Sequence, residues 1–316
     1  MVVIPAKAGI QKATGCRIKS GMTDAVLYVF LLMTALACLG SQEIFMCEFC
    51  TKHGEGKKWY ENIANYTEEV FHQVNSEGNL KAFLSNLSHS MRTDVQTAYA
   101  WKGRLPRIYS LIAYPLVTKH LKKTHFGQIV PMEDIENILG NFSSIVRLPC
   151  ICRKVTTGEN KRYCFGVGMD LTAVFKDIPD FSDFDRLPAA EAAAFIRQLD
   201  TEGNTHSVWT FNTPFIGAVC NCDRDCMAYR FQLQMKTGKA MWKGEYVAYI
   251  DPLTCSGCKE CIKRCYFGAV SYDRMNVKCL VNQRNCYGCG ICRAVCKDNA
   301  ISLLERSAIQ MVAKDW

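Results

Sequence analysis

The stretch CSGCKECIKRC at residues 255–265 is followed by a second stretch of the same pattern, CYGCGICRAVC at residues 286–296. Each run has four cysteines, with two, two and three residues between them. A cubane cluster needs four thiolates disposed about tetrahedrally, and a tight loop supplies three while a distant segment supplies the fourth. The pattern therefore predicts two 4Fe–4S clusters held by eight thiols: Cys255, Cys258, Cys261, Cys265, Cys286, Cys289, Cys292 and Cys296.

Two features of these runs separate them from a zinc site. A zinc ribbon has paired Cys-x2-Cys knuckles, which leave the third and fourth cysteine of each run unexplained. Gly257, Gly288 and Gly290 allow a backbone that wraps around a cluster, with amide N–H groups directed at sulfur. The repeat also extends beyond the cysteines, since FGAVS at 267–271 parallels DNAIS at 298–302. Iron–sulfur binding is therefore the favoured interpretation.

The spacing resembles that of bacterial two-cluster ferredoxins, and the resemblance covers residues 245–306. In that family the fourth cysteine of each run ligates the other cluster. The resemblance thus implies two ligand sets, Cys255, Cys258 and Cys261 with Cys296, and Cys286, Cys289 and Cys292 with Cys265. The family usually has proline after each fourth cysteine, whereas this chain has Tyr266 and Lys297. The local turn and the cluster potential are the properties that this departure puts in question.

Cysteine usage also bounds the cellular setting. The chain has 19 cysteines in 316 residues, an odd number that excludes complete internal disulfide pairing. Thiols one or two residues apart suit a metal better than a disulfide, which needs particular Cα separations. This usage indicates a reducing compartment, and we expect a cytoplasmic protein. The formal net charge of +8 is modest, and no basic block interleaved with aromatic residues is present, so nucleic-acid binding is not expected.

Residues 1–45 have the layout of a signal-like or anchor segment. Basic residues precede an apolar run at residues 25–39, which is shorter than the roughly twenty residues that span a bilayer. Three interpretations stand: a signal peptide or short membrane anchor, a buried helix, or a mis-assigned start with translation beginning at Met22 or Met46. We favour a mis-assigned start. Membrane association is expected only if residues 25–39 are genuine and retained.

Residues 46–130 predict a helical region. Apolar residues recur at helical spacing over 60–74, 80–87 and 108–116, with breaks at residues 75–78 and at Leu105-Pro106. We expect these helices to pack into a small bundle with a core of its own.

Residues 131–240 predict a cysteine-rich α+β middle domain. A helix is expected over 134–139, a strand over 144–148, a second helix over 189–199 and a second strand over 208–211. The expected fold class is therefore α+β, with an N-terminal helical region, this middle domain and a C-terminal ferredoxin-like domain with two clusters.

The middle domain holds a second group of thiols: Cys150, Cys152, Cys164, Cys220, Cys222 and Cys226. Each pair follows an apolar run, so the thiols are expected at strand ends around one cavity, with Arg153 and Arg224 stabilising thiolate charge. A third metal site is the leading interpretation, with an iron–sulfur cluster ahead of zinc; redox-active or merely buried free thiols remain open. Cys47-x2-Cys50 with His53 nearby leaves zinc, a redox pair or no function open.

The elements PCICR at 149–153 and CNCDRDC at 220–226, followed by the two-cluster unit, resemble a poorly characterised family of larger ferredoxin-like iron–sulfur proteins of anaerobes. That resemblance implies electron transfer. The chain has no dinucleotide fingerprint and no phosphate-binding loop. We therefore expect an electron carrier, a subunit of or donor to a larger oxidoreductase, with redox proteins as partners. The alternatives are a reductase with its own metal site in the middle domain and a redox-sensing iron–sulfur scaffold.

Overall fold

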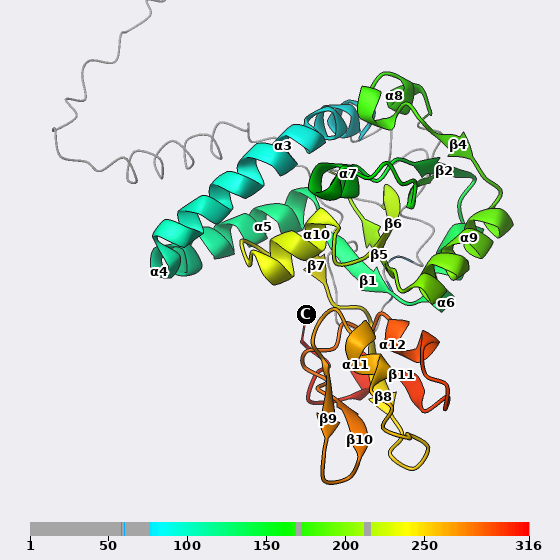
Figure 1. Cartoon of the computed structure of the whole chain (residues 1–316). Coiled ribbons are helices and arrows are strands. Elements are labelled where there is room, and N and C mark those ends of the chain that lie inside the picture. Colours follow the sequence, from blue (N-terminus) through cyan, green and yellow to red (C-terminus); the bar gives the residue numbers. More distant parts are fainter. Residues whose placement is uncertain (1–57, 59, 61–75, 169–171, 212–215, 316) are drawn as a thin grey trace, which may run out of the picture. The chain divides into compact units, whose positions relative to one another are not determined.

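The computed structural model describes residues 58, 60, 76–168, 172–211 and 216–315. The signal-like segment at 1–45 and the Cys47, Cys50 and His53 group lie outside the described residues. Helices and a mixed sheet make up the structure, and the α+β class is confirmed (Figure 1). None of the helices within the described ranges has the length and apolar character needed to cross a membrane.

The N-terminal helices are α3 (Ser76–Arg104), α4 (Pro106–Ile108) and α5 (Tyr114–Thr124), with a π-helical turn over Tyr109–Ala113 between the last two. The break at Leu105-Pro106 is confirmed. The break expected at 75–78 is wrong for residues 76–78, which form the first turn of α3, where the lack of an intrahelical partner for the amides makes glycine tolerable.

The expectation of a helical bundle with its own core is wrong. Leu80 and Leu84 of α3 are buried in one cluster with residues of the central sheet. The apolar stripe at 108–116 is exposed instead, with Leu111 at 78%. Periodicity identified amphipathic helices but not the surface against which they pack.

The central sheet has seven strands in the order β4-β2-β3-β6-β5-β1-β7. Neighbours pair antiparallel except β1 and β7, which are parallel. Their bounds are β1 Gly127–Val130, β2 Ser144–Leu148, β3 Cys164–Gly168, β4 Asp185–Arg186, β5 Thr205–Trp209, β6 Ala218–Cys222 and β7 Met241–Trp242. The strand expected over 144–148 is confirmed; the one expected over 208–211 begins at Thr205, and β1 is a strand inside the region expected to be helical.

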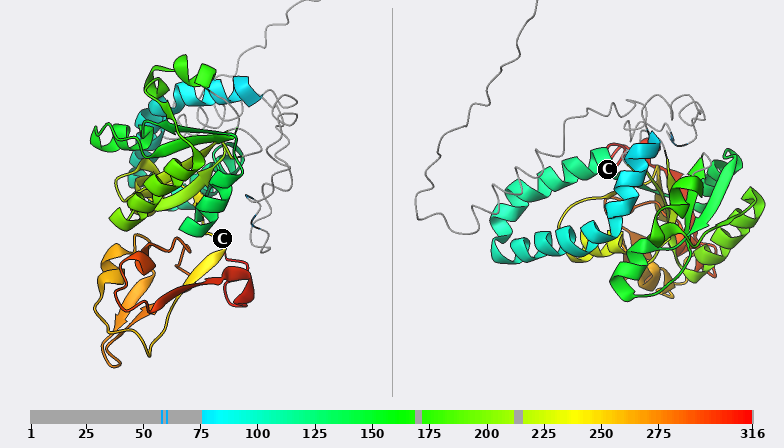
Figure 2. Two further views of the ribbon diagram at one scale, coloured as in Figure 1. Left: turned by 90° about the vertical axis from the view of Figure 1, so that its right-hand side faces the viewer. Right: turned by 90° about the horizontal axis from the view of Figure 1, so that it is seen from above.

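Helices cover both faces of this sheet (Figure 2). Alternate residues of each strand point to opposite faces, so Ile145 and Val146 belong to two different hydrophobic clusters. One cluster holds α6 (Met132–Gly140) and α9 (Ala189–Glu202), which confirm the helices expected over 134–139 and 189–199. The other holds residues of α3, α7 (Ile151–Thr157) and α10 (Met227–Tyr229). The remaining short elements on this side are α8 (Thr172–Lys176), a 3-10 turn over Pro179–Phe181 and a π-helical turn over Arg230–Gln234.

The C-terminal part is built from two similar halves. Strand β8 (Tyr246–Ile250) pairs with β11 (Ile301–Glu305), and β9 (Val270–Asp273) pairs with β10 (Lys278–Val281), both antiparallel. Helix α11 (Glu260–Arg264) lies in the first cysteine run and α12 (Ile291–Ala294) in the second, and a 3-10 turn over Arg306–Ala308 follows β11. Both cysteine runs are joined to the sheet part: the amide of Gly244 donates to the carbonyl of Tyr287, and Arg264 donates to the carbonyl of Glu202.

Candidate iron–sulfur centres

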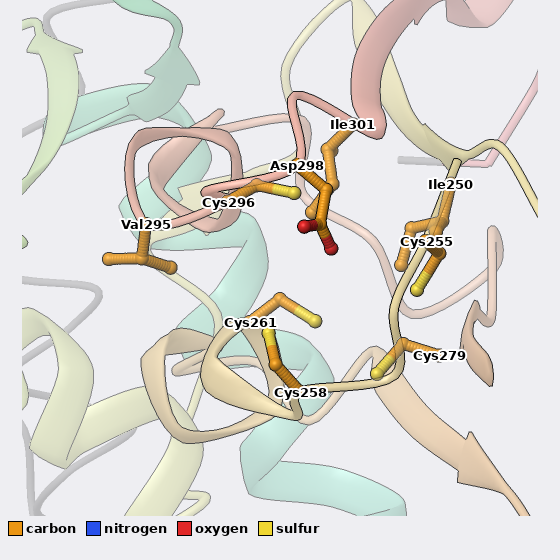
Figure 3. Close-up of a pocket in the computed structure, with 9 residues that line it drawn as sticks. All are labelled: Ile250, Cys255, Cys258, Cys261, Cys279, Val295, Cys296, Asp298 and Ile301. Atoms are coloured by element: carbon orange, nitrogen blue, oxygen red, sulfur yellow. The ribbon is translucent and has the colours of Figure 1, made fainter. Parts of the chain in front are cut away.

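One cavity gathers thiols from both cysteine runs. Its lining includes Cys255, Cys258 and Cys261 of the first run and Cys296 of the second, together with Cys279 (Figure 3). Ile250, Val295, Asp298 and Ile301 complete it. These four motif thiols are the set that the ferredoxin resemblance implies for one cluster. Within the described residues, Cys258 is the cysteine that is exposed to solvent.

Backbone amides point at the thiols in matching pairs. The amide of Gly257 donates to Cys255 Sγ at 3.4 Å, and that of Gly288 donates to Cys286 Sγ at 3.4 Å. The amides of Ala269 and Ala300 donate in the same way to the fourth cysteine of each run, both at 3.3 Å. Such donors stabilise negative charge on sulfur, whether on a free thiolate or on a metal-bound one. The internal repeat is thus present in the hydrogen bonds as well as in the sequence.

Glycine is required in both loops. Gly257 has a φ of +74° and Gly288 one of +73°, a region that residues with a side chain rarely adopt. A Cβ at Gly257 would lie 2.2 Å from the carbonyl oxygen of Val277, and one at Gly288 would lie 2.2 Å from that of Tyr246. Any larger residue would therefore displace the backbone whose amides face the thiols.

The remaining four motif thiols form a second group. Burial, and then the neighbouring thiols Cys286 and Cys265, raise the pKa of Cys292 to about 12. Burial followed by the charges of Cys292, Cys286 and Cys265 raises the pKa of Cys289 well above its usual value. The charge of Cys265, the fourth cysteine of the first run, thus acts on Cys289 and Cys292 of the second run, in agreement with the ligand set that the resemblance implies.

The six thiols of the middle region converge as well. Cys164 of β3 and Cys220 and Cys222 of β6 lie on the sheet face that α7 and α10 cover, while Cys150 and Cys226 precede these two helices and Cys152 lies in α7. The Sγ atoms of Cys150 and Cys164 are 3.5 Å apart. The hydrogen bond with Cys222, together with the positive charge of Arg153, lowers the pKa of Cys226, whereas the pKa values of the other five thiols are raised.

The two arginines expected beside these thiols differ. Arg153 is 1% exposed. Burial lowers the pKa of its guanidinium group, but the charges of Cys226 and Cys150 and the hydrogen bond with Asp223 outweigh this effect and raise the pKa. Arg224 is exposed, donates to the carbonyl of Lys263 and lies over the ring of Tyr266. The expectation that Arg224 stabilises thiolate charge is wrong, because its side chain faces the ferredoxin-like part.

The two residues that replace proline have different surroundings. Tyr266 is half-buried, donates to the carbonyl of Gly203 at the end of α9 and packs edge-on against Tyr229 with ring centroids 5.8 Å apart. Lys297 is exposed at the surface beside Cys258. Tyr266 therefore fixes the first run against the sheet part, a role that proline cannot fill.

Some site residues had no signal in the sequence. Cys279 lies outside both runs, yet it is 1% exposed, lines the first cavity and raises the pKa of Cys261 through a hydrogen bond, after burial as the larger cause. Its position depends on the pairing of β9 with β10, which no short-range pattern reveals. Among the described residues, no three cysteine, histidine, aspartate or glutamate side chains are arranged to hold a single metal ion. A cubane cluster is bound differently, through thiolates spread around four irons and four sulfides.

Comparison with known proteins gives one partial match. No family model and no solved structure matches the chain. Over 61 residues the chain is 36% identical to a protein of Methanosarcina acetivorans whose name describes it as part of an ion-translocating oxidoreductase complex. The matched part covers 19% of this chain and 22% of the relative, so the chain spans about a fifth of the length of the relative that it matches. The similarity relates this segment to a component of an oxidoreductase complex.

Proposed function

We propose that the chain is an iron–sulfur electron-transfer protein that serves a larger oxidoreductase as a subunit or donor. One observation carries the proposal: thiols from the two runs line one cavity, in the combination that a two-cluster ferredoxin uses. The residues fit such a cluster, since two glycines without room for a side chain bring amides to the thiols. The partial similarity to a component of an oxidoreductase complex supports the same class of partner.

Two ligand sets follow for the clusters. Cys255, Cys258, Cys261 and Cys296 would hold one cluster, and Cys265, Cys286, Cys289 and Cys292 the other. A bound cluster would supply a one-electron carrier. The protein supplies amide donors to sulfur and apolar burial, and each of these tunes the potential.

The surface around Cys258 is the proposed contact for a redox partner. Cys258 is exposed, and its surroundings at the surface include Glu260, Ala294 and Lys297. Because electron transfer weakens with distance, a partner gains most by docking where a ligand thiol reaches the surface. The partner is expected to be another redox protein.

The first test is the iron content and EPR spectrum of the full chain, purified without oxygen and reduced with dithionite. We expect at least about eight irons per chain and the interacting signals of two reduced cubane clusters. Replacement of Cys258 by alanine should remove about four irons. Fewer than about six irons in the wild-type chain after reconstitution would contradict the proposal, since two clusters need about eight.

A second candidate function, a reductase with its own metal site in the middle region, is favoured by a different observation. The six thiols there converge on one sheet face, away from the two ferredoxin-like runs in sequence.

A further inference from the structure

The guanidinium group of Arg153 lies buried beside the six thiols with most of its hydrogen-bonding capacity unused. Arg153 is 1% exposed, and its Nη1 donates to the Asp223 carboxylate. Its Nε and Nη2 atoms are buried and have no hydrogen-bond partner among the described residues. Buried donors of a charged group that have no acceptor are costly, so this arrangement calls for an acceptor, and best an anion, beside Nε and Nη2.

The groups around Arg153 show where that anion lies. The ring of Tyr163 is 5.3 Å from the guanidinium carbon and covers one side of it. The amide of Tyr163 donates to Cys150 Sγ at 3.0 Å, so a second donor also faces this thiol. The Sγ of Cys226 donates to Asp223 Oδ1 at 3.8 Å, and Asp223 is the carboxylate to which Arg153 Nη1 donates. The unpartnered donors and the thiols therefore share one space.

The number and placement of the thiols decide the kind of anion. Three come from strands β3 and β6, and three from the segments at or near the starts of α7 and α10, so they approach from opposite walls. All six are free in the structure. Both carboxylates near Arg153 face its Nη1, with Asp223 accepting its hydrogen bond and Glu159 3.9 Å away, so neither serves Nε or Nη2. Uncharged thiols would leave these two groups without a strong acceptor, whereas thiolates around an iron–sulfur cluster carry negative charge that can accept from them.

We propose that the six-thiol group binds a third iron–sulfur cluster, held by thiolates drawn from Cys150, Cys152, Cys164, Cys220, Cys222 and Cys226, and that Arg153 is its buried counter-charge and positioning residue. Its Nε–H and Nη2–H groups donate to the sulfur atoms of the site. The existence of this site does not depend on the proposed function. Only the use of the site in electron transfer rests on that proposal.

The six-thiol group adjoins the second ferredoxin-like group. Tyr229 is buried, and after burial the largest influences that raise its pKa are the charges of Cys289 and Cys222. Cys222, Cys226 and Cys289 belong to the same hydrophobic cluster as Tyr229. The ring of Phe267 lies 5.5 Å from that of Tyr229 and stacks on that of Tyr287 at 3.9 Å, so aromatic side chains fill the space between the two sites.

The test uses two double variants of the full chain. The Cys258→Ala/Cys289→Ala variant removes a ligand from each ferredoxin-like group, and we expect it to retain about four irons with matching sulfide. The Cys222→Ala/Cys226→Ala variant should lose about four of about twelve irons and keep the rest. No iron in the first variant, or zinc in place of iron, would overturn the inference while leaving the proposed function intact. If the first variant keeps its iron while the Cys222→Ala/Cys226→Ala variant has none, all of the iron belongs to the middle thiols. That result would count against the proposed function.

The role of Arg153 is tested separately by the midpoint potential of the signal that survives in the Cys258→Ala/Cys289→Ala background. Arg153→Gln removes a positive charge and should shift this potential to a more negative value, because reduction adds negative charge. Arg153→Lys should restore part of the shift, and it also carries the test if the glutamine variant does not fold. Arg147→Gln is the control, since Arg147 donates through both Nε and Nη2 to Asp185 and lies over the ring of Phe195 in the other hydrophobic cluster. A midpoint potential that is the same in all four proteins would overturn the proposal that Arg153 is the counter-charge of the cluster.

Discussion

Extraction of iron is expected to unfold residues 246–315 while the seven-stranded sheet stays folded. The buried cluster of this segment has thirteen residues, of which five are cysteines and three are alanines. That leaves Val247, Ile250, Val270, Ile301 and Val312 as the larger apolar side chains. A core of this size does not stabilise about 70 residues alone, so cluster binding must supply folding free energy.

Hydrogen exchange measures this effect by segment. After treatment with an oxidant and a chelator, amides of β8 and β11 should lose protection by about a hundredfold or more, while those of β2 and β3 change little. A sample carried through the same steps without chelator is the control. Equal protection of β8 and β11 in both samples would show that the segment folds without clusters.

The second large effect concerns which thiols share a cluster. Cys258 and Cys296 line the same cavity, whereas Cys265 lies with Cys286, Cys289 and Cys292. If two replaced cysteines hold the same cluster, the double variant loses only that one cluster, so the iron losses of the two single changes do not add. The Cys258→Ala/Cys296→Ala variant should therefore retain about four more irons per chain than the Cys258→Ala/Cys265→Ala variant.

Cys279 supplies the matched control for these variants. It is buried in the same cavity and contacts Cys261, but it belongs to neither run. Cys279→Ala should keep the full iron content. The reverse order, with about four more irons in the Cys258→Ala/Cys265→Ala variant, would mean that each run holds its own cluster, in conflict with the cavity that both runs line. Loss of iron on replacing Cys279 would make this thiol a ligand.

Local patterns in the sequence predicted some features and missed others for physical reasons. The eight motif thiols could be identified from their spacing, and their division into two ligand sets is what the ferredoxin resemblance implies. The strand over 144–148 and the helix over 189–199 follow from periodicity within a few residues. Features set by one segment alone were therefore predictable.

Features set by distant segments were not. Arg153 and Arg224 each follow a cysteine pair closely, yet one is buried against the thiols and the other faces the ferredoxin-like part. Arg306, which is fully buried and donates to the carbonyls of Gly244, Tyr246 and Cys286, carries no local signal at all. Each of these positions depends on how segments meet across the fold.

The central claim is that electrons are carried by clusters that the thiols of the two runs hold, and anaerobic coulometric titration tests it most directly. The wild-type chain is titrated beside the Cys258→Ala/Cys289→Ala variant, which keeps all six thiols of the middle region. We predict that the wild-type chain takes up about two electrons more than the variant, one for each cluster in the C-terminal part. An equal uptake by the two proteins would contradict the account.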